Sequence, residues 1–131
     1  MNDDCIFCAR VQGGDLIAAD GLFAAFWDRY PISPGHALVV PTRHCEGFFD
    51  LDPSEASALH GFVGLTRAAI EKTFRPDGYN IGVNSGAAAG QSVFHLHIHV
   101  IPRYWGDTND PRGGIRVLFP AEMRYWDRTE S

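Results

Sequence analysis

The sequence predicts an α+β domain, in which one long helix covers a mostly antiparallel sheet of five strands. Short apolar runs bounded by turn residues lie on both sides of a single strongly amphipathic segment near the middle of the chain. The chain has 131 residues, of which 45% are hydrophobic, and this is enough material for one core. We therefore expect a single domain over residues 1–131.

Each expected strand is a short run rich in apolar residues, and turn signals separate the runs. The five strands are expected over residues 16–19, 22–27, 36–41, 79–83 and 93–101. Asp20-Gly21 joins the first two runs and tolerates the backbone of a tight hairpin turn. A Pro-Gly turn at residues 34–35 leads into the third run.

One helix is expected over residues 53–74, where apolar side chains recur at helical spacing. Asp52 can be its N-cap, Pro53 its first residue and Glu55 the other half of a capping box. The Arg-Pro-Asp-Gly run at residues 75–78 then ends it. The part of the chain after residue 103 is rich in Gly, Pro and Arg and should be irregular.

Composition restricts the partners of the protein. With 11 basic and 16 acidic residues the formal charge is −5, so neither nucleic acid nor an anionic membrane surface is an expected partner. No apolar run approaches the ~20 residues that span a bilayer, and the first residues are acidic where a signal peptide is basic. We expect a cytoplasmic location.

Three histidines at every second position carry the chemistry. On a strand, His95, His97 and His99 share one face, while the apolar residues between them, with Phe94 and Val100, share the other. Neighbouring histidines would stand ~6.6 Å apart, so the three cannot all contact one phosphorus atom or close a zinc site alone. The middle one, His97, is the natural nucleophile, because a neutral imidazole attacks phosphorus without an external base.

The segment just before the triad suits phosphate binding. It is small and glycine-containing from Asn84 to Ser92, so backbone N–H groups and polar side chains can approach an anion there. An ordinary turn is the alternative. Joined to a histidine run, the segment becomes an oxyanion site beside a nucleophile.

These residues resemble the histidine triad (HIT) family motif, in which three histidines alternate with apolar residues. The likeness covers roughly residues 5–103 and includes the stretches at 25–28, 33–41 and 90–92. It is nearest to the Hint branch and its bacterial relatives, and extends to the Pro-Arg-Gly-Gly pattern at residues 111–114. The implied fold is the HIT fold, and the implied assembly is a homodimer.

The resemblance also implies roles for individual residues. His97 would be the nucleophile, and His99 and His36 would complete the catalytic cluster. Asp28 would hydrogen-bond the ribose of a purine nucleotide. The phosphate would be surrounded by Asn84, Gly90, Gln91 and Ser92, and the base pocket would be lined by Ile6, Phe7, Phe26 and Trp27. Plain core packing is the alternative for the apolar residues.

A Cys-x-x-Cys pair near the start suggests metal or redox chemistry. In zinc-containing relatives the metal is bound by such a pair, a histidine after the third strand and the first histidine of the triad. The corresponding residues are Cys5, Cys8, His44 and His95. Four protein ligands would make the zinc structural, with no metal required for catalysis. The alternative is two free buried thiols, with His95 orienting its neighbour.

The resemblance implies a nucleotide hydrolase or transferase that forms a covalent nucleotidyl-histidine intermediate, and the Hint branch favours a purine nucleoside phosphoramidase. A dinucleoside polyphosphate hydrolase is the alternative, because the arginines at positions 103, 112 and 116 suit additional phosphates, although they can equally pair with acidic residues. A nucleotide-binding scaffold protein and a redox protein using the two cysteines are further alternatives.

Overall fold

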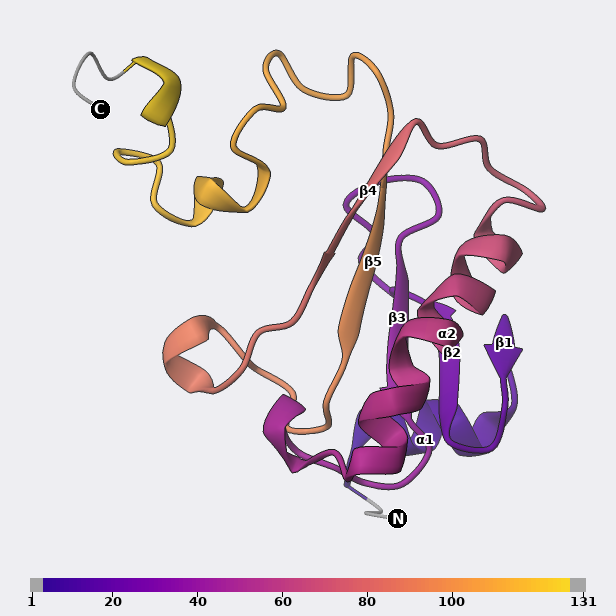
Figure 1. The fold of residues 1–131 in the computed structure, drawn as a ribbon. Coiled ribbons are helices and arrows are strands. Elements are labelled where there is room, and N and C mark those ends of the chain that lie inside the picture. Colours follow the sequence, from indigo (N-terminus) through magenta and orange to yellow (C-terminus); the bar gives the residue numbers. More distant parts are fainter. Residues whose placement is uncertain (1–3, 128–131) are drawn as a thin grey trace.

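Five strands form one antiparallel sheet in the order β1-β2-β3-β5-β4 (Figure 1). Their bounds are β1 Ala18–Ala19, β2 Phe23–Trp27, β3 Ala37–Pro41, β4 Gly78–Gly82 and β5 Ile98–Arg103. The computed structural model describes residues 4–127. The architecture confirms the predicted α+β class with an antiparallel sheet.

Helix α2 runs from Pro53 to Ile70 and starts as predicted. The Asp52 carboxylate accepts the N–H of Glu55 at 2.9 Å, and the Glu55 carboxylate accepts the N–H of Asp52 at 2.9 Å, so the capping box is confirmed. The helix ends at Ile70 rather than at residue 74, because the N–H groups of Lys72 and Thr73 bond back only three residues and tighten the chain into turns.

A second helix, α1 (Ile6–Gly13), was not expected from the sequence. Its N-cap is Cys5, whose sulfur accepts the N–H of Cys8 at 3.3 Å, and Gly14 ends it with a φ of 76°. Sulfur is not among the usual N-cap acceptors, which is one reason why the sequence did not predict this helix. The helix places the Cys-x-x-Cys pair at one end of the sheet.

The two faces of the sheet bury different side chains. One face packs on α2 through a cluster that includes Phe23, Val39, Phe62 and Val100. The opposite face, which we call the histidine face, carries residues of β2, β3 and β5 together with α1. Its members are Ala24, Phe26, Asp28, His36, Leu38, Val40, His97 and His99, and Phe7 of α1 packs among them.

The last strand begins later than predicted. β5 starts at Ile98, so His95 and His97 lie in the segment that leads into it and not within the strand. Side chains still alternate between the two faces from Leu96 to Val100. The apolar ones, Leu96, Ile98 and Val100, are buried in the core under α2. Phe94 breaks the expected pattern, since it is 47% exposed instead of buried with them.

The segment after β5 extends to one side of the sheet, beyond the edge strand β4 (Figure 1). It contains two short 3-10 helices, Gly114–Leu118 and Tyr125–Asp127, in otherwise irregular chain. Among residues 4–127, no helix combines the length and the apolar character that a membrane crossing needs.

Candidate active site

His97 is held by its own chain. Its Nδ1 atom lies 2.9 Å from the carbonyl oxygen of His95, and the side chain is buried against the edge of the Phe7 ring at a centroid distance of 5.0 Å. A carbonyl can only accept, so Nδ1 carries the ring proton. The lone pair is therefore on Nε2, which is the atom that a nucleophile needs.

His36 and His99 form a directional pair. The N–H of Ile32 donates to Nδ1 of His36 at 3.2 Å, so the proton of the His36 ring is on Nε2. This Nε2–H donates to Nδ1 of His99 at 2.9 Å. The proton of His99 is consequently on its own Nε2, and His99 presents a donor where His97 presents a lone pair.

Burial sets the charge of these rings. It lowers the pKa of His99 to about 4, and the neighbouring rings of His97 and His36 add to the effect. Burial also lowers the pKa of His36, although the Asp28 carboxylate, 3.4 Å from its Nε2, opposes the shift. The pair is therefore neutral near pH 7 in the free protein.

The sheet register brings these groups together. In the pairing of β2, β3 and β5, Phe26 faces Leu38 and Leu38 faces His99. Asp28 and His36 lie at the matching ends of β2 and β3, where the N–H of Asp28 donates to the carbonyl of His36 at 3.0 Å. Strand alternation therefore places all five side chains on the histidine face, where Phe26 and Leu38 are buried beneath the polar groups.

Phe7 and Phe26 form an aromatic wall beside the nucleophile, with ring centroids 5.5 Å apart. Ile6 is 60% exposed on α1. Trp27 does not belong to this wall: it follows Phe26 on a strand, so it points to the opposite face and packs edge-on against Phe74 at 5.8 Å. The structure therefore places Trp27 apart from Phe7 and Phe26, in a pocket that it lines with Asp28, His36 and Phe74.

The glycine-containing segment precedes the triad as a loop with one 3-10 turn, Ala87–Ala89. The Gln91 amide ties this loop down, because its Oε1 accepts the N–H of Gly86 at 3.0 Å and its Nε2 donates to the carbonyls of Glu46 and Val93. Gly90 adopts a φ of 93°, which favours glycine. Asn84 is half-buried and Ser92 is exposed.

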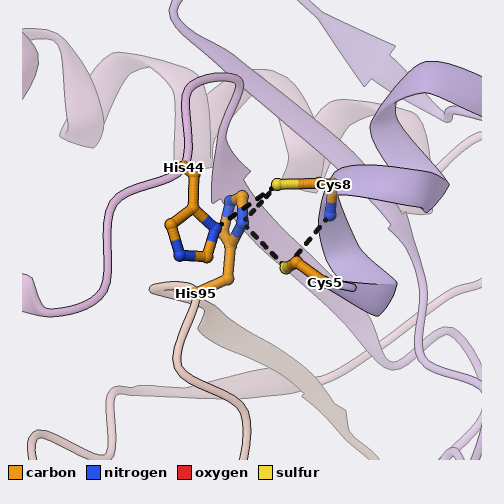
Figure 2. Close-up of side chains that lie close together, drawn as sticks. All are labelled: Cys5, Cys8, His44 and His95. Carbon is orange, nitrogen blue, oxygen red and sulfur yellow. Dashed lines mark hydrogen bonds between the residues drawn. The ribbon is translucent and has the colours of Figure 1, made fainter. Parts of the chain in front are cut away.

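The four predicted metal ligands meet in one cluster (Figure 2). Nδ1 of His95 lies 3.4 Å from both sulfur atoms, and Nδ1 of His44 lies 3.4 Å from Cys8 Sγ. One ligand atom from each of the four residues lies within 4.8 Å of the other three. Helix α1 supplies the cysteines and the loop after β3 supplies His44.

This donor set fits zinc. Zn–S bonds of ~2.3 Å and Zn–N bonds of ~2.0–2.1 Å at tetrahedral angles separate S and N ligands by about 3.6 Å, close to the distances found. Nε2 of His95 donates to the carbonyl of Pro41 at 2.9 Å, which leaves the Nδ1 lone pair facing the sulfur atoms. Burial lowers the pKa of His95 and favours this neutral ligand form.

Two other residues with reactive side chains lie outside both clusters. Cys45 is buried beside His44, with its sulfur 3.6 Å from the carbonyl of Gly47, and burial raises its pKa. His60 is exposed on α2. Sequence reasoning missed the carbonyls of His95 and Pro41, which fix the histidine tautomers and leave no signal in residue type.

The chain matches the HIT domain family over residues 9–106. It is 40% identical over 110 residues to the AP-4-A phosphorylase of Mycobacterium tuberculosis, spanning 82% of this chain and 56% of that protein. It is 38% identical over 106 residues to the adenylylsulfatase HINT3 of Arabidopsis thaliana, spanning 79% of this chain and 54% of that one. The chain thus covers little more than half the length of either relative.

A solved structure of a zinc-bound histidine triad family protein from Mycobacterium smegmatis superposes with a TM-score of 0.72 at 38% identity, covering 82% of this chain and 80% of that chain. The family match, the sheet order and the placement of three histidines around one site agree with one another. The chain belongs to the HIT domain family.

Proposed function

We propose that the protein is a nucleotide hydrolase or transferase whose His97 forms a covalent bond to the α-phosphorus of a purine nucleotide, with nucleoside phosphoramidates as its substrates. The observation that carries the proposal is the bond from His97 Nδ1 to the carbonyl of His95 at 2.9 Å. It fixes the ring so that the Nε2 lone pair is available, without a proton transfer before attack.

The reaction has two steps. In the first, Nε2 of His97 bonds to phosphorus, the bond from phosphorus to the amine nitrogen breaks, and the departing amine takes a proton from the solvent, while the Nε2–H of His99 hydrogen-bonds a phosphoryl oxygen. In the second, water attacks phosphorus, gives a proton to the solvent and releases the nucleoside monophosphate, while the bond to His97 breaks. Since burial lowers the pKa of His99 to about 4, this ring stays neutral and acts as a hydrogen-bond donor in both steps.

Substrate contacts follow from the same face. Asp28 is half-buried beside His36 and offers carboxylate oxygen to a ribose diol. The N–H groups of Gly90 and Gln91 donate to the carbonyls of Ala87 and Gly86, and with the Gln91 side chain they keep the loop in shape. The exposed Ser92 at its end then offers a hydroxyl to the phosphate. Phe7 and Phe26 are the apolar wall for the base, with Ile6 at its rim.

We further propose that Cys5, Cys8, His44 and His95 hold one structural zinc ion. The closed set of four protein ligands leaves no open position, so the ion would fix α1 to the triad segment and take no part in the reaction. The fit of the donor distances and the tautomer of His95 support this assignment.

Hydrolysis of dinucleoside polyphosphates is the second candidate, favoured by the likeness to the AP-4-A phosphorylase. Against it, two of the three arginines considered for extra phosphates are already paired. Arg103 binds Asp107 at 2.8 Å and Arg112 binds Asp110 at 2.9 Å. A nucleotide-binding scaffold would keep the same geometry but would turn over neither substrate.

One preparation of the protein tests these alternatives. We expect kcat/KM for an adenosine or guanosine phosphoramidate to exceed that for diadenosine tetraphosphate. A preference of about tenfold or more for the tetraphosphate, corresponding to ~1.4 kcal/mol, would overturn the choice of substrate. If that preference disappeared on truncation before Asp110, the C-terminal segment would be its cause.

The nucleophile is tested separately. His97→Ala should lose turnover while nucleoside monophosphate binding stays within about tenfold, since the imidazole supplies bond formation more than ground-state affinity. Quenched wild-type reactions should contain a nucleotidyl-protein adduct detectable by mass spectrometry, and His97→Ala reactions should not. More than a few per cent of wild-type kcat in the variant would refute the assignment.

A further inference from the structure

Arg10 lies over the aromatic wall of the histidine face. Its Cζ atom is 4.2 Å from the centroid of the Phe26 ring, a stacking arrangement that suits a guanidinium group. Nη2 donates to the carbonyl of Trp27 at 3.1 Å, which anchors the side chain next to Asp28 in the chain. Two independent contacts therefore hold this cation at one place on the wall.

The wall connects Arg10 with the nucleophile. The Phe7 ring contacts His97 at 5.0 Å and Phe26 at 5.5 Å, and Arg10 covers Phe26. Both rings are buried, so a nucleotide with its phosphorus at His97 and its ribose at Asp28 would have its base at the edge of this wall, beside Arg10. The guanidinium group of Arg10 then belongs to the base site rather than to the phosphate site.

The donors of Arg10 are mostly unused by the protein. A guanidinium group has five N–H donors, and in the described part of the chain the only recorded acceptor for them is the Trp27 carbonyl. Five other arginines form ion pairs with carboxylates, but between residues 4 and 127 no such pair includes Arg10; the paired ones are Arg43, Arg67, Arg103, Arg112 and Arg124. Arg10 is half-buried, so hydrogen bonds from its remaining donors to a ligand would be partly shielded from water.

The chemistry of a planar donor fork selects among purines. Guanine and hypoxanthine present two adjacent acceptors, O6 and N7, and a guanidinium group can donate to both at once. Adenine replaces O6 with an amino group, a donor that cannot accept from arginine. We infer that Arg10 makes this site prefer 6-oxopurine nucleotides, with guanine or hypoxanthine as the base, over adenine nucleotides. The inference rests on the proposed function insofar as it takes this face as the nucleotide site.

Binding of reaction products tests the inference without any turnover. Titration calorimetry with GMP, IMP and AMP should give wild-type Kd values for GMP and IMP that are lower than that for AMP by about fivefold or more. Arg10→Met should remove most of this difference by weakening GMP and IMP binding. Arg10→Lys, which keeps the charge but loses the planar fork, should retain only part of it.

Arg75→Met is the matched control, because Arg75 also donates to a backbone carbonyl, that of Glu71 at 2.6 Å, but does so at the end of α2. It should leave all three Kd values unchanged. Near-ultraviolet circular dichroism of each variant confirms that the aromatic packing is intact.

Each contrary outcome has a distinct meaning. Two outcomes would overturn the inference: equal wild-type affinity for GMP and AMP, or an equal loss of affinity for GMP, IMP and AMP in Arg10→Met. Either would leave Arg10 as a stacking platform without base selectivity. If none of the three nucleotides binds, both this inference and the proposed function are overturned. Selective GMP and IMP binding without turnover of phosphoramidate would refute the proposed reaction alone.

Discussion

Nε2 of His36 and Nδ1 of His99 lie 2.9 Å apart, and the N–H of Ile32 fixes which of the two rings donates. We propose that His36 is a positioning residue that aims the Nε2–H of His99 at the site. The two rings are brought together because β3, which directly follows His36, pairs with β5, which carries His99. The role of His36 can be separated from that of His99 by mutation.

His36→Ala should lower kcat by roughly 10–100-fold with little change in KM, since it removes the ring that orients the His99 donor and leaves the binding groups in place. Steady-state kinetics with a phosphoramidate substrate measures kcat and KM separately. His60→Ala, which alters an exposed histidine of α2, is the control and should have wild-type kinetics. A fully active His36→Ala protein would contradict the positioning role.

Zinc content and stability should change together at the cysteine cluster. Protein purified without chelator should contain about one zinc per chain by elemental analysis. Cys8→Ser should lose the metal and several kcal/mol of unfolding free energy, because α1 is then no longer tied to the triad segment. Cys45→Ala, at a buried cysteine outside the cluster, should keep its zinc. Metal-free wild-type protein with intact thiols would contradict the site.

Stability should fall as the pH drops from about 6.5 toward 4. Burial lowers the pKa of His99 to about 4 in the folded protein, whereas an unfolded chain binds a proton at this residue near pH 6.5. The unfolded state therefore binds more protons within this window, and the contribution of His99, up to about 3 kcal/mol, is lost progressively toward pH 4.

Urea unfolding of zinc-free protein at several pH values measures this dependence without interference from metal release. His99→Gln should flatten it, although His36 and His95, whose pKa values burial also lowers, keep some slope in the same direction. An unchanged slope in His99→Gln would show that His99 is solvated in the folded protein.

We propose that the protein is a homodimer through β4 and α2. Strand β4 pairs only with β5 among the described strands, and a groove of about 570 Å³ between β4 and α2 is lined by apolar side chains, including Leu59, Val63 and the 55% exposed Ile81. Light scattering should give twice the chain mass of 14.5 kDa at micromolar concentration.

Charge at the centre of this groove should separate the two copies. Ile81→Asp should reduce the measured mass to that of one chain, because the carboxylate would be desolvated at the interface. Ile32→Asp, at a 75% exposed residue of the loop between β2 and β3, should leave the mass unchanged. A wild-type monomer at these concentrations would contradict the assembly.

Sequence patterns predicted the structure correctly where neighbouring residues alone determine it. The Asp52–Glu55 capping box and the Asp20-Gly21 turn, in which the Asp20 carboxylate accepts the N–H of Leu22 and Phe23, need only neighbouring residues. The family resemblance selected Cys5, Cys8, His44 and His95 as one set, and the structure brings these four residues together.

The sequence predicted the position of a side chain less well in two cases. In one, the position depends on the face of the sheet to which the residue points; in the other, it depends on the path of a long side chain. Trp27 was grouped with its neighbour Phe26 by resemblance, although alternation along β2 separates them. Arg10 reaches back over Phe26 from α1, a helix that the sequence did not reveal, so its placement required the tertiary structure. Helix α1 has only eight residues and gains its position from the sheet and the cysteine cluster.

The position of β5 between β3 and β4 also determines when the site can assemble during synthesis. During synthesis β4 emerges before β5, its partner in the sheet. β4 therefore has no strand to pair with while residues 83–97 emerge. The β1-β2-β3 hairpins contain only local pairings and can form before that point. A nascent chain that stops before Ile98 therefore carries Asp28 and His36 beside a partial sheet that lacks the strand between β3 and β4, so the candidate site is complete only after β5 has been made.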